Sequence, residues 1–199
     1  MRNLFWFFIL AGIALYFVYN GFFERKGNGL DRLKANYGAD IDAVCAEMGL
    51  PAAYFKALVI LESSAEKPAH TRFEAHIYQK LKDVKEGHLE RYGKFTTSQL
   101  KHVSENTLEK LSTSWGPMQI MGYHCIPLGI DFEQLQGSES IRYGIQWADK
   151  SYGNLLRQGD FKNAFHIHNT GQRIPDSGKI LTHDPKYIDR GMEYMAAFK

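Results

Sequence analysis

The sequence predicts a mainly α-helical domain preceded by one apolar N-terminal segment. Apolar side chains recur at helical spacing in several segments, and Ile141, Ile145 and Ala148 give one of the clearest examples. No long segment alternates apolar with polar residues, so strands should be few and short. The 199 residues are 44% hydrophobic and 23% charged, which is ordinary for a folded protein with a core. We therefore expect one helical domain with few or short strands.

The apolar segment near the N-terminus, residues 4–23, has about the length that a bilayer-spanning helix needs. Aromatic residues at both of its ends suit the membrane–water interface, and no small-residue cleavage site follows it. We predict an uncleaved signal anchor over residues 1–23, in contact with the lipid bilayer, and a linker over residues 24–36. Basic residues flank the segment on both sides and do not decide its orientation.

Charge and cysteine content exclude several classes of function. The formal net charge is +2, and the charged residues before residue 27 account for all of it. The remaining domain lacks the basic surface of a nucleic-acid-binding protein. Cys45 and Cys125 permit one disulfide, but their spacing does not show proximity, so we favour two buried thiols. Because no Cys/His zinc spacing and no HExxH motif is present, we expect no metal and no cofactor.

The folded domain is predicted over residues 37–199, and its first helix covers residues 40–48. Gly49 suits the left-handed position that ends such a helix. A more apolar helix begins at Pro51, where the missing N–H is no loss, and ends at Glu62. This second helix carries the main candidate for catalysis.

Glu62 shares a helical face with Phe55 and Leu58, so its carboxyl group should lie at the end of a buried face. Burial removes water from the charged form of the carboxyl group, and the negative end of the helix dipole also disfavours that form. We expect a raised pKa, which suits a general acid at neutral pH. The alternative is that Glu62 only marks the point where the helix reaches the surface.

The middle of the chain is less regular. A helix is expected over residues 72–85, and residues 88–112 should form one or two polar helices, with Thr97 or Ser98 as a cap. The segment 114–123 that follows is aromatic and rich in turns.

The last third of the chain is predicted to be helical. A helix is expected over residues 138–157, where apolar residues line one face. Gly159 and Asp160 should end it and cap the next helix, residues 161–168. The final helix should begin at about Lys186.

Three separated motifs resemble those of the lysozyme-like transglycosylase superfamily. The sequence ESS at residues 62–64 is similar to the catalytic Glu-Ser motif, and GPMQIM at residues 116–121 is similar to Gly-Leu-Met-Gln-Ile. The sequence HNTG at residues 168–171 is similar to Tyr-Asn-Ala-Gly, and Tyr187 matches a tyrosine near the end of the superfamily's domain. The order and spacing of all four matches make the combination fairly specific.

Within the superfamily, the chain is most similar to the N-acetylmuramidases of phage endolysins and bacterial cell-wall enzymes. Residues 73–78 match the Phe-Glu-x-His-Ile-Phe segment of that family, and residues 114–122 match Ser-Trp-Gly-x-x-Gln-Ile-Met-Gly. The resemblance covers about residue 40 to the C-terminus. Two departures are Pro117, where the family has leucine, and His168, where tyrosine is common.

The resemblance implies a lysozyme-like fold and hydrolysis of the MurNAc–GlcNAc β-1,4 bond in peptidoglycan. Glu62 would be the general acid and Glu74 a candidate second carboxylate that activates water. If Glu74 points elsewhere, the enzyme would instead be a lytic transglycosylase that forms anhydro-MurNAc with Glu62 alone. A further alternative is an anchored module that binds glycan strands without cutting them.

The resemblance also implies a set of substrate-binding residues: Ser63, Trp115, Gln119, Tyr123, Asn169 and Tyr187. Four of these side chains would equally suit a structural role: Trp115 and Tyr123 in a core, Asn169 at a helix end, and Gln119 beside backbone groups. Because peptidoglycan lies outside the cytoplasm, we expect a single-pass inner-membrane protein. Its N-terminus would lie inside the cell and its catalytic domain in the periplasm.

Overall fold

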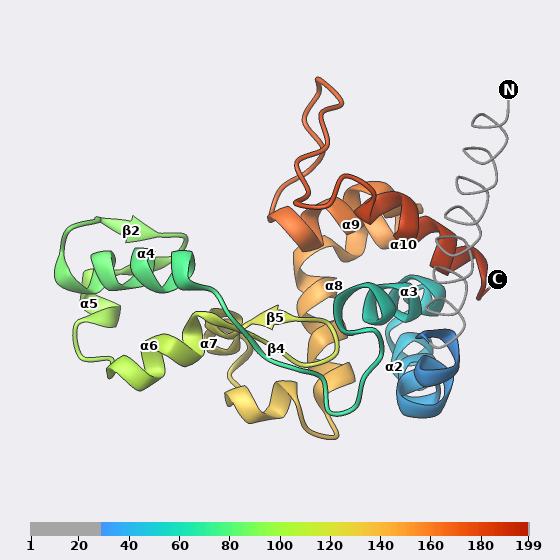
Figure 1. The fold of residues 1–199 in the computed structure, drawn as a ribbon, viewed down its shortest axis with the longest axis horizontal. Helices are drawn as coiled ribbons and strands as arrows, with labels where there is room; N and C mark the ends of the chain where they lie inside the picture. The colour runs from blue at the N-terminus through green and yellow to red at the C-terminus, as the bar shows by residue number, and fades with distance from the viewer. Residues whose placement is uncertain (1–28, 199) are drawn as a thin grey trace, which may run out of the picture.

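The structure is a computed structural model that describes residues 29–198. This part of the chain is mainly helical, with five strands of two or three residues each, so the predicted fold class is confirmed at that level (Figure 1). The anchor predicted over residues 1–23 lies outside the described residues. Within residues 29–198, none of the helices combines the length and the hydropathy that a membrane span requires.

The described chain begins in a helix at residue 29 and continues through the π-helical turn η1 (Lys34–Gly38) into α2 (Ala39–Met48). Leu33 is fully buried in the main core, so this segment belongs to the domain. The linker predicted over residues 24–36 is therefore corrected from residue 29 onward. The physical reason is a helical repeat among polar neighbours, in which Leu33 and Tyr37 turn the same face to the core.

The helix α3 (Ala52–Ser63) is the central element of the larger lobe. Many of its apolar residues, among them Tyr54, Phe55 and Leu58, are completely buried. Pro51 precedes its first turn, and Ser64 ends it in the left-handed conformation, with its N–H donating to the carbonyl of Ile60. This termination places Glu62 in the last turn of a buried helix, as the sequence predicts.

A smaller lobe forms between residues 75 and 111 and has an apolar core of its own (Figure 1). Its elements are α4 (Ala75–Glu86), β2 (Arg91–Tyr92), β3 (Phe95–Thr96), α5 (Thr97–Leu100) and α6 (Glu105–Leu111). The helix predicted over residues 72–85 begins only at Ala75, because residues 72 and 73 pair as a strand. The predicted caps Thr97 and Ser98 are wrong.

Thr96 and Ser104 are the residues that cap these two helices. Thr96 forms a capping box with Gln99, whose side chain returns to the Thr96 backbone N–H. The Ser104 side chain accepts a hydrogen bond from the Thr107 N–H.

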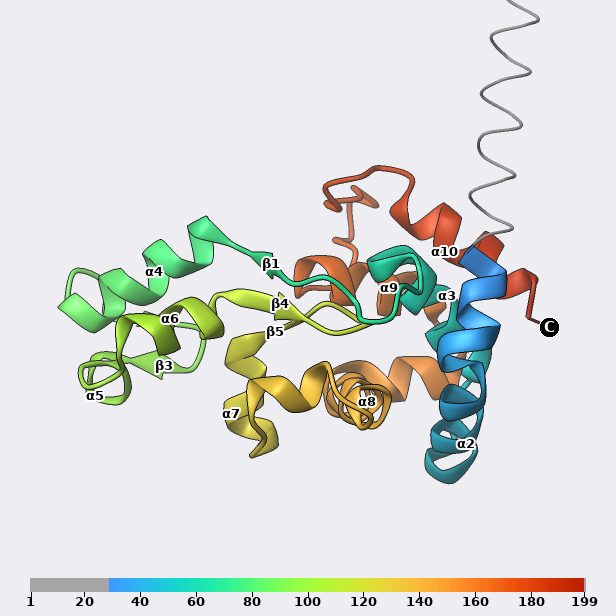
Figure 2. The ribbon, with the colours of Figure 1, turned by 60° about the horizontal axis from the view of Figure 1, so that its bottom comes forward.

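A three-stranded antiparallel sheet joins the two lobes. Its strands are β1 (Arg72–Phe73), β4 (Thr113–Trp115) and β5 (Ile120–Met121), in the order β1-β4-β5. Figure 2 shows this sheet between the smaller lobe and the helices of the larger one. The chain therefore leaves the larger lobe on β1 and comes back on β4, and β5 runs antiparallel to β4.

Most of the remaining helices complete the larger lobe. After the sheet, the short η2 (Gly122–His124) packs on α6 of the smaller lobe. The helices that follow are α7 (Cys125–Leu128), η3 (Phe132–Leu135), α8 (Ser140–Gln158), α9 (Phe161–Thr170) and α10 (Tyr187–Ala196). The three long helices lie within two residues of their predicted bounds, and Asp160 caps α9 as predicted. Both cysteines are buried free thiols, which confirms the favoured alternative. Helix α10 packs along α3 and so brings its first residue, Tyr187, beside Glu62.

Candidate active site

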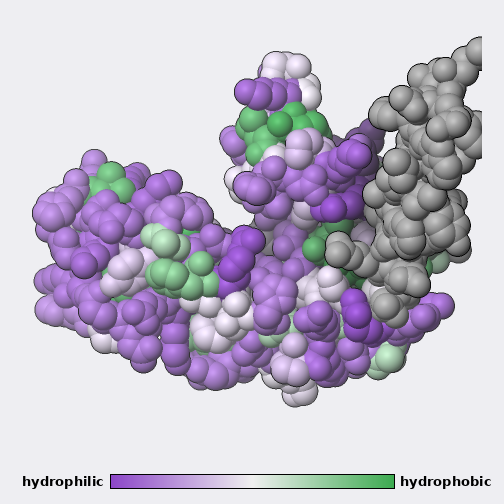
Figure 3. Space-filling view, viewed as in Figure 1, coloured by the Kyte–Doolittle hydropathy of each residue, from purple (hydrophilic) through white to green (hydrophobic). Residues whose placement is uncertain are grey.

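A polar cleft of about 370 Å³ is lined by residues of both lobes and of the connecting sheet. The space-filling view shows the surface hollowed between the two lobes (Figure 3). The lining includes two carboxylates, Glu62 and Glu74, and the guanidinium of Arg72. Four histidines also line it: His70, His76, His124 and His168. The cleft therefore concentrates ionisable groups, a pattern that is common at functional sites.

Glu62 lies in the last turn of α3, and its side chain is only 16% exposed. The hydroxyl of Tyr187, the first residue of α10, donates a hydrogen bond to Glu62 Oε1. Burial raises the pKa of Glu62 to about 7, against the opposing effects of this hydrogen bond and of the positive charge of Arg72. A substantial fraction of Glu62 is therefore protonated at neutral pH.

His168 lies in the last turn of α9, and its ring contacts groups on three other segments. Its Nε2 lies 3.9 Å from Glu62 Oε1 and 3.0 Å from the carbonyl oxygen of Met118. Its Nδ1 lies 2.8 Å from the hydroxyl of Tyr152. Because a carbonyl oxygen only accepts hydrogen bonds, we assign the proton to Nε2 and let the Tyr152 hydroxyl donate to Nδ1.

This arrangement keeps His168 uncharged beside Glu62. Burial lowers the pKa of His168 to about 4, although its hydrogen bond to Met118 opposes the shift. An imidazolium at this distance would favour the ionised form of Glu62 and lower its pKa. The neutral imidazole therefore helps to keep the Glu62 carboxyl group available as a proton donor.

Glu74 precedes the first residue of α4, and its side chain is 17% exposed in the cleft. The Arg72 Nε donates to Glu74 Oε1 at 2.6 Å, and His76 Nδ1 lies 3.7 Å from Glu74 Oε2. Arg72 also acts electrostatically on Glu62. One guanidinium thus influences both carboxylates, which places them in a common electrostatic environment.

Gln119 lines the cleft, but its side chain is committed to hydrogen bonds within the protein. Its Nε2 donates to the backbone carbonyls of His70 at 2.8 Å and Gly116 at 3.0 Å. Its Oε1 accepts from Ser114 Oγ at 2.9 Å. The residue adopts a left-handed conformation with φ of 48°, which is uncommon for glutamine. Gln119 therefore ties the turn between β4 and β5 to the segment before β1.

Two other predicted binding residues, Tyr123 and Asn169, line the cleft directly. The Tyr123 ring packs edge-on against Tyr92 and Phe95 of the smaller lobe, with centroids 6.3 and 6.0 Å apart. Asn169 is exposed in the last turn of α9. Tyr187 does not line the cleft and acts through its hydrogen bond to Glu62.

Ser63 and Trp115 are not among the residues that line the cleft, and this corrects their predicted role in substrate binding. The Ser63 hydroxyl is buried and donates to the carbonyl of Val59 at 3.0 Å. Trp115 donates from Nε1 to the carbonyl of Lys110 at 3.0 Å and stacks on Phe132. Ser63 follows Glu62 directly on a helix, so the two side chains point in different directions.

Two residues that the sequence did not single out, Arg72 and Tyr152, hold Glu74 and His168 in place. The contact between Arg72 and Glu74 could be predicted from the sequence. Residues two apart on an extended segment point to the same side, and Glu74 is two residues after Arg72. The contact of Tyr152 could not be predicted, since it depends on how α8 and α9 pack.

No protein-family model matches the chain, and no curated protein or solved structure matches it significantly. Within residues 29–198, no cluster of three or more His, Cys, Asp or Glu side chains is arranged to hold a metal ion.

Replacing Tyr187 with phenylalanine should raise the pKa of Glu62 above its value of about 7. The hydroxyl donates to the carboxylate, and a hydrogen bond to the charged form stabilises that form. Carbon-detected NMR titration of the glutamate carboxyls would measure the shift. Tyr78→Phe is the matched control, because Tyr78 also donates to a glutamate, Glu105, outside the cleft. An unchanged or lowered pKa of Glu62 in Tyr187→Phe would contradict the assignment.

Proposed function

We propose that this chain is a peptidoglycan muramidase with a lysozyme-like fold, which hydrolyses the MurNAc–GlcNAc β-1,4 bond. The observation that carries the proposal is Glu62, a cleft-lining carboxyl group with a pKa of about 7. Glycoside hydrolysis requires an acid that protonates the leaving oxygen, together with a second group that acts on the anomeric carbon or on water. Glu62 and Glu74 are the carboxylates that line this cleft.

Glu62 would act as the general acid through its Oε2 atom. Its Oε1 accepts the hydrogen bond from Tyr187, so the transferable proton resides on the other oxygen. After proton transfer, the same hydrogen bond stabilises the carboxylate that remains. His168 stays neutral beside it and leaves the Glu62 pKa in the range that proton donation needs.

Glu74 would activate the attacking water in a hydrolytic mechanism. In that role it takes a proton from water on the face of the sugar opposite to Glu62, and Arg72 would orient its carboxylate. The contacts of Glu74 also favour one alternative. Both of its oxygens have protein partners, Arg72 and His76, as expected of a group that supports the cleft wall. In that case the sugar's own hydroxyl would attack, as in a lytic transglycosylase.

Product analysis with Glu74→Gln separates the two reactions. Purified peptidoglycan would be treated with the wild-type chain and with Glu74→Gln, and the new glycan ends identified by mass spectrometry. We expect reducing MurNAc ends from the wild type and a loss of roughly 10²-fold or more in Glu74→Gln. Anhydro-MurNAc ends at similar rates in both proteins would instead support the transglycosylase.

The proposed substrate also fixes a location. Peptidoglycan lies outside the cytoplasm, so the catalytic domain would lie in the periplasm behind the anchor predicted over residues 1–23. The anchor would then run with its N-terminus inside the cell. The proposed location depends entirely on the proposed peptidoglycan substrate.

A further inference from the structure

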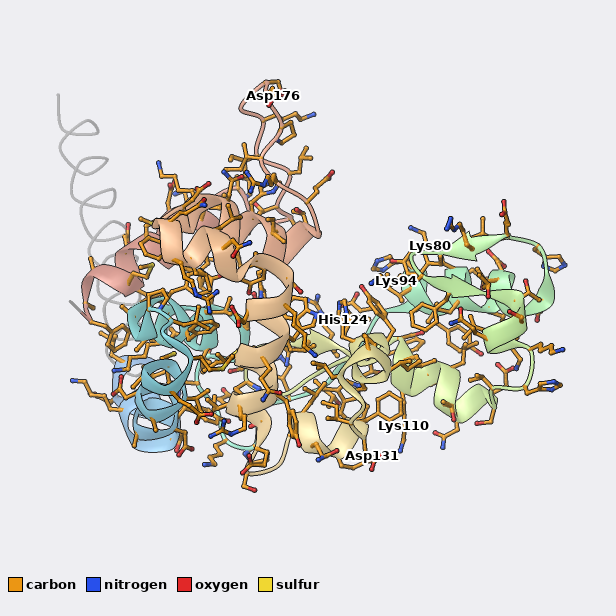
Figure 4. The ribbon with its side chains drawn as sticks, turned by 180° about the vertical axis from the view of Figure 1, so that it is seen from behind. Lys80, Lys94, Lys110, His124, Asp131 and Asp176 are labelled. Carbon is orange, nitrogen blue, oxygen red and sulfur yellow. The ribbon has the colours of Figure 1, made fainter. Side chains whose placement is uncertain are left out.

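Two lysines of the smaller lobe, Lys80 and Lys94, lie beside the cleft. Lys80 belongs to α4, and its Nζ is 5.3 Å from the ring centroid of Tyr92, which lines the cleft. Lys94 lies in the turn between β2 and β3. Figure 4 shows Lys94 at the edge of the smaller lobe that faces His124, with Lys80 beside it. Both ammonium groups therefore border the entrance to the cleft from one side.

The positive charge of Lys94 acts on His124, a residue that lines the cleft. The pKa of His124 is lowered to about 4, mainly by burial and in addition by the positive charge of Lys94. Lys80 and Lys94 are both exposed, so their ammonium groups are open to a ligand in solvent.

Neither lysine is neutralised by the protein. Among the described residues, no carboxylate lies within 4.0 Å of Lys80 or Lys94. Other lysines of the same lobe do have partners: Lys85 pairs with Glu105 at 2.5 Å, and Lys82 with Glu86 at 3.9 Å. The cleft edge of this lobe thus carries two positive charges that an anionic ligand would complement.

We propose that Lys80 and Lys94 form an anion-binding rim that recognises carboxylates of the peptides attached to the glycan strand. This inference rests on the proposed muramidase function. The peptide branches from the sugar on its lactyl group, so it must leave the cleft over an edge, and its free carboxylates are exposed. Lysine, a compact charge on a flexible stem, suits such mobile single carboxylates. The rim would make strands that carry peptides better substrates than bare strands.

The test compares glycan strands that carry peptides with strands from which an amidase has removed them. The 199-residue chain and the variant Lys80→Ala/Lys94→Ala would be assayed on both substrates at low salt. We expect the ratio of kcat/KM, peptide-bearing over bare, to fall about 2- to 30-fold in the variant, mainly through KM, because exposed ion pairs contribute modestly. Added salt should reduce the wild-type ratio as well.

Two controls make the result specific. Lys80→Arg/Lys94→Arg should retain most of the wild-type ratio, since it keeps both charges. Lys101→Ala removes an exposed lysine of the same lobe at the end of α5, and should leave the ratio unchanged. An unchanged ratio in the double alanine variant, or an equal loss on both substrates, would overturn the rim.

Binding measurements keep this test separate from that of the proposed function. Affinity for the two kinds of strand would be measured with the same proteins by co-sedimentation. A chain that cuts neither strand contradicts the muramidase proposal. A binding preference for peptide-bearing strands that disappears in Lys80→Ala/Lys94→Ala would still support the rim, and equal binding of both strands by the wild type would refute it.

Discussion

Replacing Glu62 with glutamine should lower the rate of glycan cleavage by roughly 10²- to 10⁴-fold, the usual contribution of a general acid. Glutamine has nearly the same shape, and its carbonyl oxygen can still accept the hydrogen bond from Tyr187. It has no proton to give to the leaving oxygen. We therefore expect a folded protein that binds glycan strands and does not cut them.

The release of new sugar ends from purified glycan strands would measure this loss. Glu66→Gln is the matched control, because Glu66 is an exposed glutamate just beyond α3 and outside the cleft. Circular dichroism would verify that both variants fold. A Glu62→Gln protein that cuts within tenfold of the wild-type rate would exclude Glu62 as the acid.

The same substitution should make the protein more stable at alkaline pH. Glu62 has a pKa of about 7 in the folded protein, against an ordinary value of 4.5. Between these values the folded state binds more protons than the unfolded state, so the free energy of unfolding falls as the pH rises through this window. Glutamine does not titrate and avoids the loss. We expect Glu62→Gln to gain on the order of 3 kcal/mol relative to wild type between pH 4 and pH 8.

Urea unfolding at pH 4 and at pH 8 would measure the gain. At each pH, the free energy of unfolding of wild type is subtracted from that of Glu62→Gln. We then compare this difference at pH 8 with the difference at pH 4. Glu66→Gln, which removes an exposed carboxyl group outside the cleft, would be measured alongside as the control. A pH-independent difference for Glu62→Gln would mean that the carboxyl group is not held protonated by its surroundings. A gain in stability with a loss of activity is typical of an active-site residue.

Local sequence signals predicted most of the helices. Residues close together in the sequence determine these features. Examples are the end of α2 at Gly49, the Asp160 cap of α9 and the buried face of α3. The position of Glu62 at the end of an apolar helix belongs to this class as well. Its raised pKa therefore had a readable cause in the sequence, namely burial at the end of that helix.

The partners of Glu62 were only partly accessible from the sequence. Tyr187 stands 125 residues further along the chain and reaches Glu62 only because α10 packs along α3. His168 depends in the same way on the packing of α9 against Met118 and Tyr152. The resemblance to known motifs pointed to these positions without their contacts. It also pointed to Ser63 and Trp115, whose side chains the packing directs into the protein.

The most direct test of the central claim is mass spectrometry of what the wild-type chain releases from purified peptidoglycan at neutral pH. The proposal predicts glycan fragments with reducing MurNAc ends, and no such fragments from Glu62→Gln. Glycan strands that are bound but remain intact would contradict it, as would fragments cut only at peptide or amide bonds.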